Sequence, residues 1–71
     1  MDIRLTEREY NVLNYVVCGL TNKEIAEELH ISVHTVKAHL EAIYDKFKVK
    51  NRVQAAIKAV MLDLIKVESL K

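Results

Sequence analysis

The sequence predicts an all-α fold, a four-helix bundle that contains a helix-turn-helix. The chain of 71 residues has no proline and one glycine, so few positions interrupt a helix. Its apolar residues recur at three- and four-residue spacing, which is typical of amphipathic helices. Residues that cap helix starts stand directly before each of these stretches. A chain of this length forms a single domain, here residues 1–71.

Composition excludes several classes of protein. With 51% hydrophobic residues, the chain can form a core and is not a disordered tail. Its one cysteine cannot form an intramolecular disulfide, which favours a reducing compartment. No apolar run approaches the roughly 18 residues of a membrane span, and the first residues lack the layout of a signal peptide. We therefore expect a cytoplasmic protein without membrane contact.

A capping box opens the first helix. The Thr6 hydroxyl can accept from the Glu9 amide, while the Glu9 carboxylate accepts from the Thr6 amide. The apolar residues that follow share one helix face: Tyr10, Leu13, Val16 and Val17. Gly19 supplies the left-handed residue that commonly ends a helix. We expect this helix over residues 7–18.

A second capping box follows at once. Thr21 and Glu24 have the same spacing and predict a helix over residues 22–29. Directly after it comes His30, a residue type that tolerates positive φ better than most.

The third helix is the candidate reader of a helix-turn-helix. Ser32 caps it, and it covers residues 33–47 with inward positions at Val36, Leu40, Ile43 and Phe47. Only three residues separate it from the preceding helix, which matches the turn of a helix-turn-helix.

The fourth helix is predicted from Asn51 and Gln54, a third reciprocal cap, and covers residues 52–65. Its core stripe is expected at Val53, Ile57, Val60, Met61 and Leu64. The opposite side also carries apolar residues, and a helix apolar on two faces usually has a second partner. We expect this second stripe to be a dimer contact formed by Ala55, Ala59, Leu62 and Lys66.

Charge is distributed unevenly along the chain. Residues 33–52 carry five basic and two acidic side chains, whereas residues 1–32 carry three basic and six acidic ones. A positive centre after an acidic flank suggests an element that faces a polyanion. A solvated, lysine-rich helix end explains the same pattern without a nucleic acid.

The outward face of the third helix suits the major groove of DNA. A helix turns about 100° per residue, so the residues that point directly away from the core are His34, Ala38, Glu41 and Asp45, and Lys37 lies on one flank of this face. Lys37 can reach a guanine acceptor or a phosphate, and Glu41 can accept from the cytosine amino group. Ala38 allows close approach and contact with a thymine methyl. The candidate base-reading residues are His34, Lys37, Ala38 and Glu41.

Other polar residues suit the DNA backbone. Beyond the groove, cationic side chains can anchor phosphates at Lys46, Lys48, Lys50 and Arg52. At the start of the second helix, Asn22 and Lys23 can hold the opposite strand.

These motifs together resemble the LuxR-type (GerE-like) DNA-binding domain of bacterial transcriptional regulators over about residues 4–65. The matching stretches, in order, are Leu5-Thr6-Glu7-Arg8-Glu9, Gly19-Leu20-Thr21-Asn22-Lys23-Glu24-Ile25-Ala26, Ile31-Ser32, Thr35-Val36-Lys37-Ala38-His39, Asn51-Arg52 and Ala55-Ala56.

The resemblance implies that the third helix reads the bases and the fourth mediates dimerisation. Lys37, Ala38 and Glu41 fall on the family's base-reading positions, although basic or polar side chains are frequent where this chain has Glu41. The resemblance also places three residues where the family contacts the backbone or holds the reader: Thr35, Lys46 and Arg52. Expected partners are double-stranded DNA with inverted half-sites, a second copy paired on DNA, and RNA polymerase. Such regulators often carry an N-terminal receiver or ligand-binding domain.

Two other functions fit parts of the sequence. A promoter-reading fragment of a sigma factor also uses a capped helix-turn-helix, but the Asn51-Arg52 start favours the LuxR type. A helical protein-interaction module explains the fourth helix but not the positive segment. An enzyme is disfavoured because no acid–base pair, nucleophile–base set or glycine-rich phosphate loop is present. His30 and His34 lack a third ligand, so we expect no metal and no cofactor.

Overall fold

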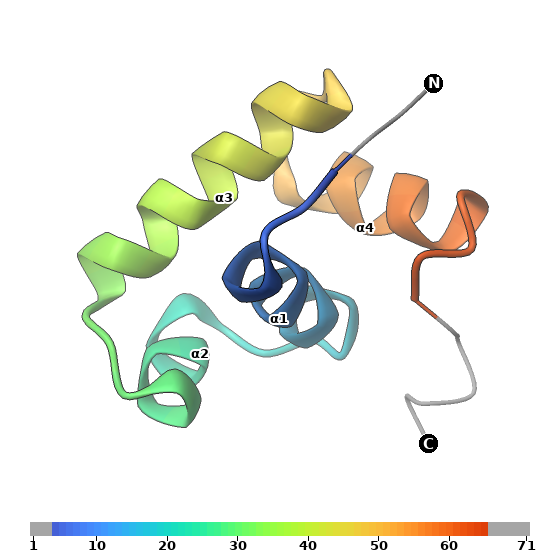
Figure 1. The fold of residues 1–71 in the computed structure, drawn as a ribbon. Coiled ribbons are helices and arrows are strands. Elements are labelled where there is room, and N and C mark those ends of the chain that lie inside the picture. The colour runs from blue at the N-terminus through green and yellow to red at the C-terminus, as the bar shows by residue number, and fades with distance from the viewer. Residues whose placement is uncertain (1–3, 66–71) are drawn as a thin grey trace.

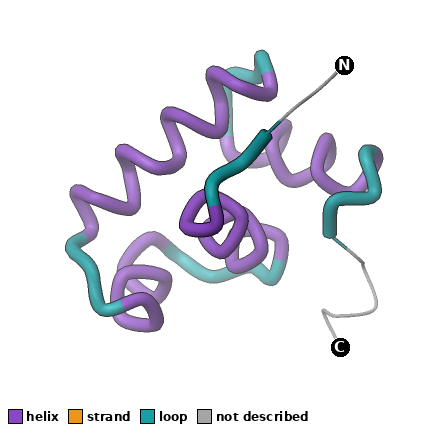
Figure 2. Tube along the Cα trace, in the orientation of Figure 1, coloured by secondary structure: helices purple, strands orange, loops and turns teal. Residues whose placement is uncertain are grey.

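The computed structural model describes residues 4–65 of the chain. It contains four helices in the order α1 (Glu7–Val17), α2 (Asn22–Leu29), α3 (Val33–Phe47) and α4 (Arg52–Met61). α1 lies at the centre, and α2, α3 and α4 surround it (Figure 1). Short loops join the helices, and the described part of the chain contains no strand (Figure 2). The predicted all-α fold is confirmed.

The helix starts form as the sequence predicts. Thr6 and Thr21 each complete a capping box with the glutamate three residues later. At the start of α4, the Asn51 side chain accepts from the Gln54 amide at 2.9 Å. The reciprocal half of this cap differs from the prediction, because the Gln54 side chain bonds the amide of Lys50.

The helix ends share one geometry. Just beyond each helix, one backbone amide donates to the carbonyl of the residue five positions earlier. Leu20, for example, donates to Tyr15 at 3.0 Å. The equivalent donors are Ile31, Val49 and Leu64, and all four of these apolar residues pack against the core. This is the arrangement of a Schellman motif, in which an apolar residue after the helix covers its last turn.

Two helices end earlier than predicted. α1 stops at Val17, one residue short, with Gly19 left-handed as expected. α4 stops at Met61, four residues before the predicted end, because Asp63 adopts a φ of 59° and turns the chain. The turn places Ile65 in the core. Asp tolerates this conformation better than most residues, so it can end a helix where glycine is missing.

The faces of α4 are reversed relative to the prediction. Ala55 and Ala59 are fully buried, whereas Val53, Ile57 and Met61 are 66%, 54% and 79% exposed. The expected dimer contact through the two alanines is therefore wrong. The expected core stripe is wrong at Val53, Ile57 and Met61, whereas Leu64 packs against the core as predicted. α4 packs against α1 and α3 with its small residues, which allow helix backbones to approach closely. The larger apolar side chains are left on the outside.

α1 buries only part of the predicted stripe. Leu13 and Val16 are buried as predicted. Val12 is fully buried, whereas Tyr10 is 43% exposed. A helix that is surrounded on several sides buries residues beyond one stripe, which explains the difference.

Candidate nucleic-acid interface

The two faces of α3 separate as predicted. Its core side is buried at Val36, Leu40, Ile43 and Phe47. The opposite side is exposed at His34, Lys37, Ala38 and Glu41. α3 therefore presents the four candidate base-reading residues to solvent from a helix that is fixed along its whole length.

The start of α3 is held by its own cap. The Ser32 hydroxyl accepts from the Thr35 amide at 3.0 Å, and the two side-chain oxygens lie 2.9 Å apart. Thr35 is half-buried in this arrangement. Its hydroxyl thus helps to fix the first turn of α3, beside the exposed His34 and Lys37.

Four predicted site residues meet in one hollow. This hollow has a volume of about 210 Å³ and lies where α2, α3 and α4 come together. Its lining residues are Asn22, Lys37, Leu40, Glu41, Tyr44 and Arg52. The sequence assigned Lys37 and Glu41 to bases and Asn22 and Arg52 to phosphates, and the fold places both groups side by side.

Arg52 is engaged inside the fold. Its Nη1 donates to Oδ1 of Asn22 at 2.5 Å, and its Nη2 donates to the Leu20 carbonyl. Arg52 therefore ties the first residue of α4 to the start of α2. Its guanidinium is thus engaged by two acceptors within the fold, whereas the sequence also predicted a phosphate contact for it.

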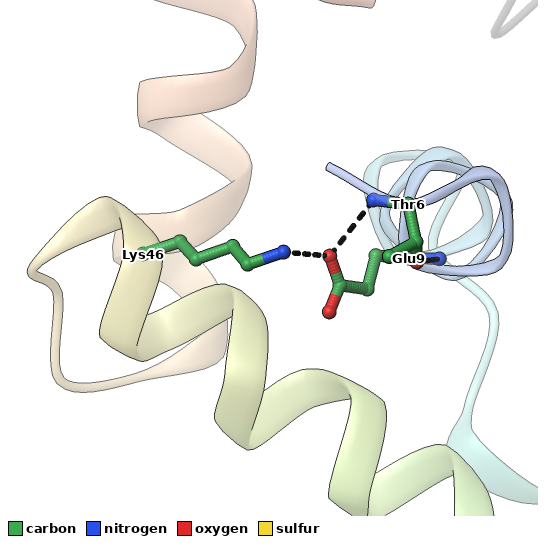
Figure 3. Close-up of polar contacts among 3 residues, drawn as sticks. All are labelled: Thr6, Glu9 and Lys46. Carbon is green, nitrogen blue, oxygen red and sulfur yellow. Dashed lines mark hydrogen bonds and ion pairs between the residues drawn. The ribbon is translucent and has the colours of Figure 1, made fainter. Parts of the chain in front are cut away.

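Lys46 is also engaged inside the fold. Its ammonium lies 2.6 Å from Oε1 of Glu9, which also accepts from the Thr6 amide at 3.0 Å (Figure 3). Burial raises the pKa of Glu9, but the hydrogen bonds from Lys46 and Thr6 and the charge of Lys46 lower it more, so the pKa is lowered overall. The Lys46 ammonium is thus paired with a buried carboxylate, and the phosphate contact predicted for Lys46 stays a prediction.

The remaining candidate cations are exposed. Lys23, Lys37, Lys48 and Lys50 all lie at the surface. Lys48 ends α3 in the left-handed conformation, with a φ of 57°. Unlike Lys46 and Arg52, these four lysines extend into solvent from α2, α3 and the connection after α3.

α4 carries an outward apolar surface between two shallow grooves. One groove, of about 420 Å³, is lined by Lys48, Val49, Gln54, Ile57, Lys58, Met61 and Leu62. The other, of about 360 Å³, is lined by Val17, Ala56, Ile57, Val60 and Met61. Ile57 and Met61 belong to both and form the ridge between them. Of the predicted dimer residues, Leu62 lies here and is exposed, while Lys66 lies outside the described residues.

The sequence comparisons agree with this architecture. The pattern of the bacterial regulatory proteins of the luxR family matches residues 4–59, which include all four helix starts. The chain belongs to the LuxR family. It is thus a LuxR-type DNA-binding helix-turn-helix domain, as the residues of the capping boxes and of α3 suggested.

Several characterised LuxR-type proteins are similar to this chain. The transcriptional regulatory protein LnrK of Bacillus subtilis is 54% identical over 56 residues, which are 79% of this chain and 26% of LnrK. LiaR of the same organism is 49% identical over 55 residues, 78% of this chain and 26% of LiaR. The response regulator protein VraR of Staphylococcus aureus is 44% identical over 61 residues, 86% of this chain and 29% of VraR. The chain therefore spans about a quarter of the length of these relatives.

Three features of this LuxR-type domain were not predicted from the sequence. The pair of Glu9 and Lys46 joins residues far apart in the chain, and no local spacing indicates it. The contact of Lys58 with the Phe47 carbonyl joins two helices across 11 residues of the chain, and no helical spacing indicates it. The exposed ridge of α4 was assigned to the core. The sequence does contain a signal for this feature, because Ala55 and Ala59 are small enough to allow close helix packing on the buried side of α4.

Two absences within the described residues bear on other functions. None of the helices within residues 4–65 has the length and apolar composition of a bilayer-spanning segment. In the same range, no three potential metal ligands among histidine, cysteine, aspartate and glutamate come close enough to share an ion.

Proposed function

We propose that this chain binds double-stranded DNA in a sequence-specific manner and serves as the DNA-reading part of a transcription regulator. The observation that carries the proposal is the division of α3 into a buried face and an exposed polar face. Its length of 15 residues corresponds to about 22 Å, enough to lie along the major groove. Family membership supports the same function.

The exposed face of α3 offers the chemistry of direct readout. Lys37 is a donor for guanine or phosphate, and Glu41 is an acceptor for the cytosine amino group. Ala38 leaves room for a thymine methyl, and His34 stands at the end of the helix that enters the groove. Exposed lysines around this face supply phosphate contacts at Lys23, Lys48 and Lys50.

The proposed pairing of two copies uses the outward ridge of α4. Ile57 and Met61 are large apolar residues with more than half of their surface exposed, and a groove lies on each side. Two copies related by a two-fold axis can set each ridge against the other copy's grooves. Such a pair places identical α3 helices in grooves about one turn of DNA apart, so the expected target has inverted half-sites. The limited area of the ridge favours pairing on DNA, where two bound copies are already close.

Selection of binding sites from a pool of random duplexes tests the proposal. We expect enrichment of one short motif, present as an inverted pair, and an affinity for it that falls as salt rises. The salt dependence also tests the alternative of a protein-interaction module, because a helical protein partner does not release condensed counterions. Failure to enrich any motif at low salt would contradict sequence-specific binding.

A further inference from the structure

The C-terminal end of α3 is held by a side chain from α4. Nζ of Lys58 donates a hydrogen bond of 2.9 Å to the carbonyl oxygen of Phe47. Phe47 is the last residue of α3, and its carbonyl is among those that have no partner within the helix. A cation at this end also complements the negative pole of the helix. Lys58 thus caps α3 from a different helix.

A second side chain of α4 holds the connection that follows α3. Oε1 of Gln54 accepts from the backbone amide of Lys50 at 2.8 Å. Gln54 and Lys58 are four residues apart and therefore lie on one face of α4. The connection over residues 48–50 is consequently fixed from α4 on both sides, by Lys58 at Phe47 and by Gln54 at Lys50.

This connection carries two of the exposed cations, Lys48 and Lys50. Lys48 has a φ of 57°, a conformation that is unfavourable for residues other than glycine. Neighbouring contacts must therefore stabilise the backbone here. The contacts from α4 fix the backbone from which Lys48 and Lys50 extend, next to the C-terminal end of α3.

We propose that Lys58 is a positioning residue for DNA recognition, which acts through the end of α3 and the connection after it without touching DNA itself. The inference rests on the proposed DNA-binding function. Lys58 is half-buried, it lines the groove beside Met61 and Leu62, and its ammonium is turned to the Phe47 carbonyl. Its positive charge therefore lies at the C-terminal end of α3.

The test compares Lys58→Met with Lys58→Arg. Methionine keeps an unbranched apolar stem and loses the donor, whereas arginine keeps the charge and can donate to a carbonyl. Affinity is measured across a salt series for a selected duplex and for an unrelated one, at a temperature where circular dichroism shows full helix. For Lys58→Met we expect affinity for the selected duplex to fall by about threefold to tenfold. The affinity for the unrelated duplex should fall less, and the salt dependence of binding should stay unchanged. Lys58→Arg should restore the affinity for the selected duplex.

Two results would overturn the inference. Equal losses on both duplexes, with a salt slope reduced by about one, would mean that Lys58 contacts a phosphate directly. Unchanged affinity with a lower melting temperature would mean that the contact serves stability alone. If the unsubstituted chain binds no duplex, the proposed function fails and the inference with it.

Gln54→Met provides an independent variant should Lys58→Met fail to fold. It removes the second contact from α4 without any change of charge, and the cap formed by the Asn51 side chain and the residue 54 amide remains possible. We expect a lower affinity for the selected duplex, again with an unchanged salt slope. Wild-type affinity in this variant would also overturn the inference.

Discussion

The Lys46 ammonium, on the last turn of α3, donates a 2.6 Å hydrogen bond to Oε1 of Glu9 on the first turn of α1. The same oxygen accepts from the Thr6 amide at 3.0 Å. One carboxylate oxygen therefore completes the cap of the central helix and ties that helix to α3. Any change that neutralises Glu9 should weaken both contacts together.

We predict that the stability of the domain falls in acid partly because of Glu9. Its pKa is held below the ordinary value of 4.5, so the ionised carboxylate favours the folded state. This contribution is complete above the ordinary pKa and is lost as pH falls through the lower pKa of the folded state. Glu9→Gln should reduce stability by about 1 kcal/mol at neutral pH, because Lys46 is partly solvated and the pair is correspondingly weak.

Urea unfolding at a series of pH values between about 2 and 7 measures this effect. The matched control is Glu7→Gln, which removes an exposed carboxylate from the same first turn. The difference between wild type and Glu9→Gln should shrink as pH decreases. A difference that is constant with pH would show that the ionisation of Glu9 does not contribute.

Substitutions of Arg52 distinguish a structural role within the fold from a contact with DNA. Arg52→Met should destabilise the fold by about 1–3 kcal/mol, because the Asn22 side chain and the Leu20 carbonyl lose their donor. Arg52→Lys should recover part of this, since lysine lacks the planar fork that serves two acceptors. Below the melting temperature, the salt slope of DNA binding should be unchanged in both variants. A slope reduced by about one in Arg52→Met would restore the phosphate role expected from sequence.

The sequence predicted the starts of the helices better than their ends. A helix start depends on residues three apart, such as Thr21 with Glu24, and that spacing is visible in the chain. Three of the four ends use a residue other than glycine in the left-handed conformation: His30, Lys48 and Asp63. Of these three ends, the sequence indicates only the one at His30, whose residue type tolerates positive φ. The end of α4 was misplaced because apolar residues continue past Met61 without a glycine.

The candidate site was predictable where it lies on one face of one helix. The exposed face of α3 followed from the position of Val36 and the helical period alone. The roles of Lys46 and Arg52 did not, because their acceptors lie 37 and 30 residues away in the chain. Periodicity also failed for α4, since both of its faces are apolar and only the packed structure distinguishes Ala55 from Ile57.

Lys37→Ala should weaken DNA binding and leave the fold intact. Lys37 is exposed on the outer face of α3 and lines the hollow next to Glu41. Loss of a good base contact corresponds to about 1–3 kcal/mol, and loss of a phosphate contact to less, with a smaller salt slope. Fluorescence anisotropy on the selected duplex measures the change. Arg8→Ala, which removes an exposed cation from α1, is the control, and equal effects of the two variants would exclude a specific role for Lys37.

Glu41→Lys should raise affinity for unrelated duplexes and reduce discrimination at one base pair. The exposed carboxylate repels phosphates and can accept from a base amino group such as that of cytosine, whereas an ammonium attracts phosphates of any sequence. Repeating the site selection with the variant measures both effects. Asp45→Lys makes the same charge change one turn further along α3 and is the control. If both variants select the wild-type motif with the same stringency, Glu41 does not read a base.

The reversed faces of α4 lead to opposite expectations for two aspartate substitutions. Ile57→Asp should leave the helical content unchanged, because the side chain is 54% exposed on the ridge between the two grooves. It should abolish cooperative occupancy of paired inverted half-sites, since each copy would place a carboxylate in an apolar contact. Affinity for a single half-site should persist.

Ala59→Asp is the matched variant on the buried face. Ala59 is fully buried, so the carboxylate would enter the core without a partner and the domain should unfold. Circular dichroism separates the two variants, and titration of duplexes with one or two half-sites measures cooperativity. Cooperative filling of both half-sites by Ile57→Asp would place the dimer contact elsewhere. Loss of helix in Ile57→Asp together with retention in Ala59→Asp would instead restore the face assignment that periodicity alone predicts.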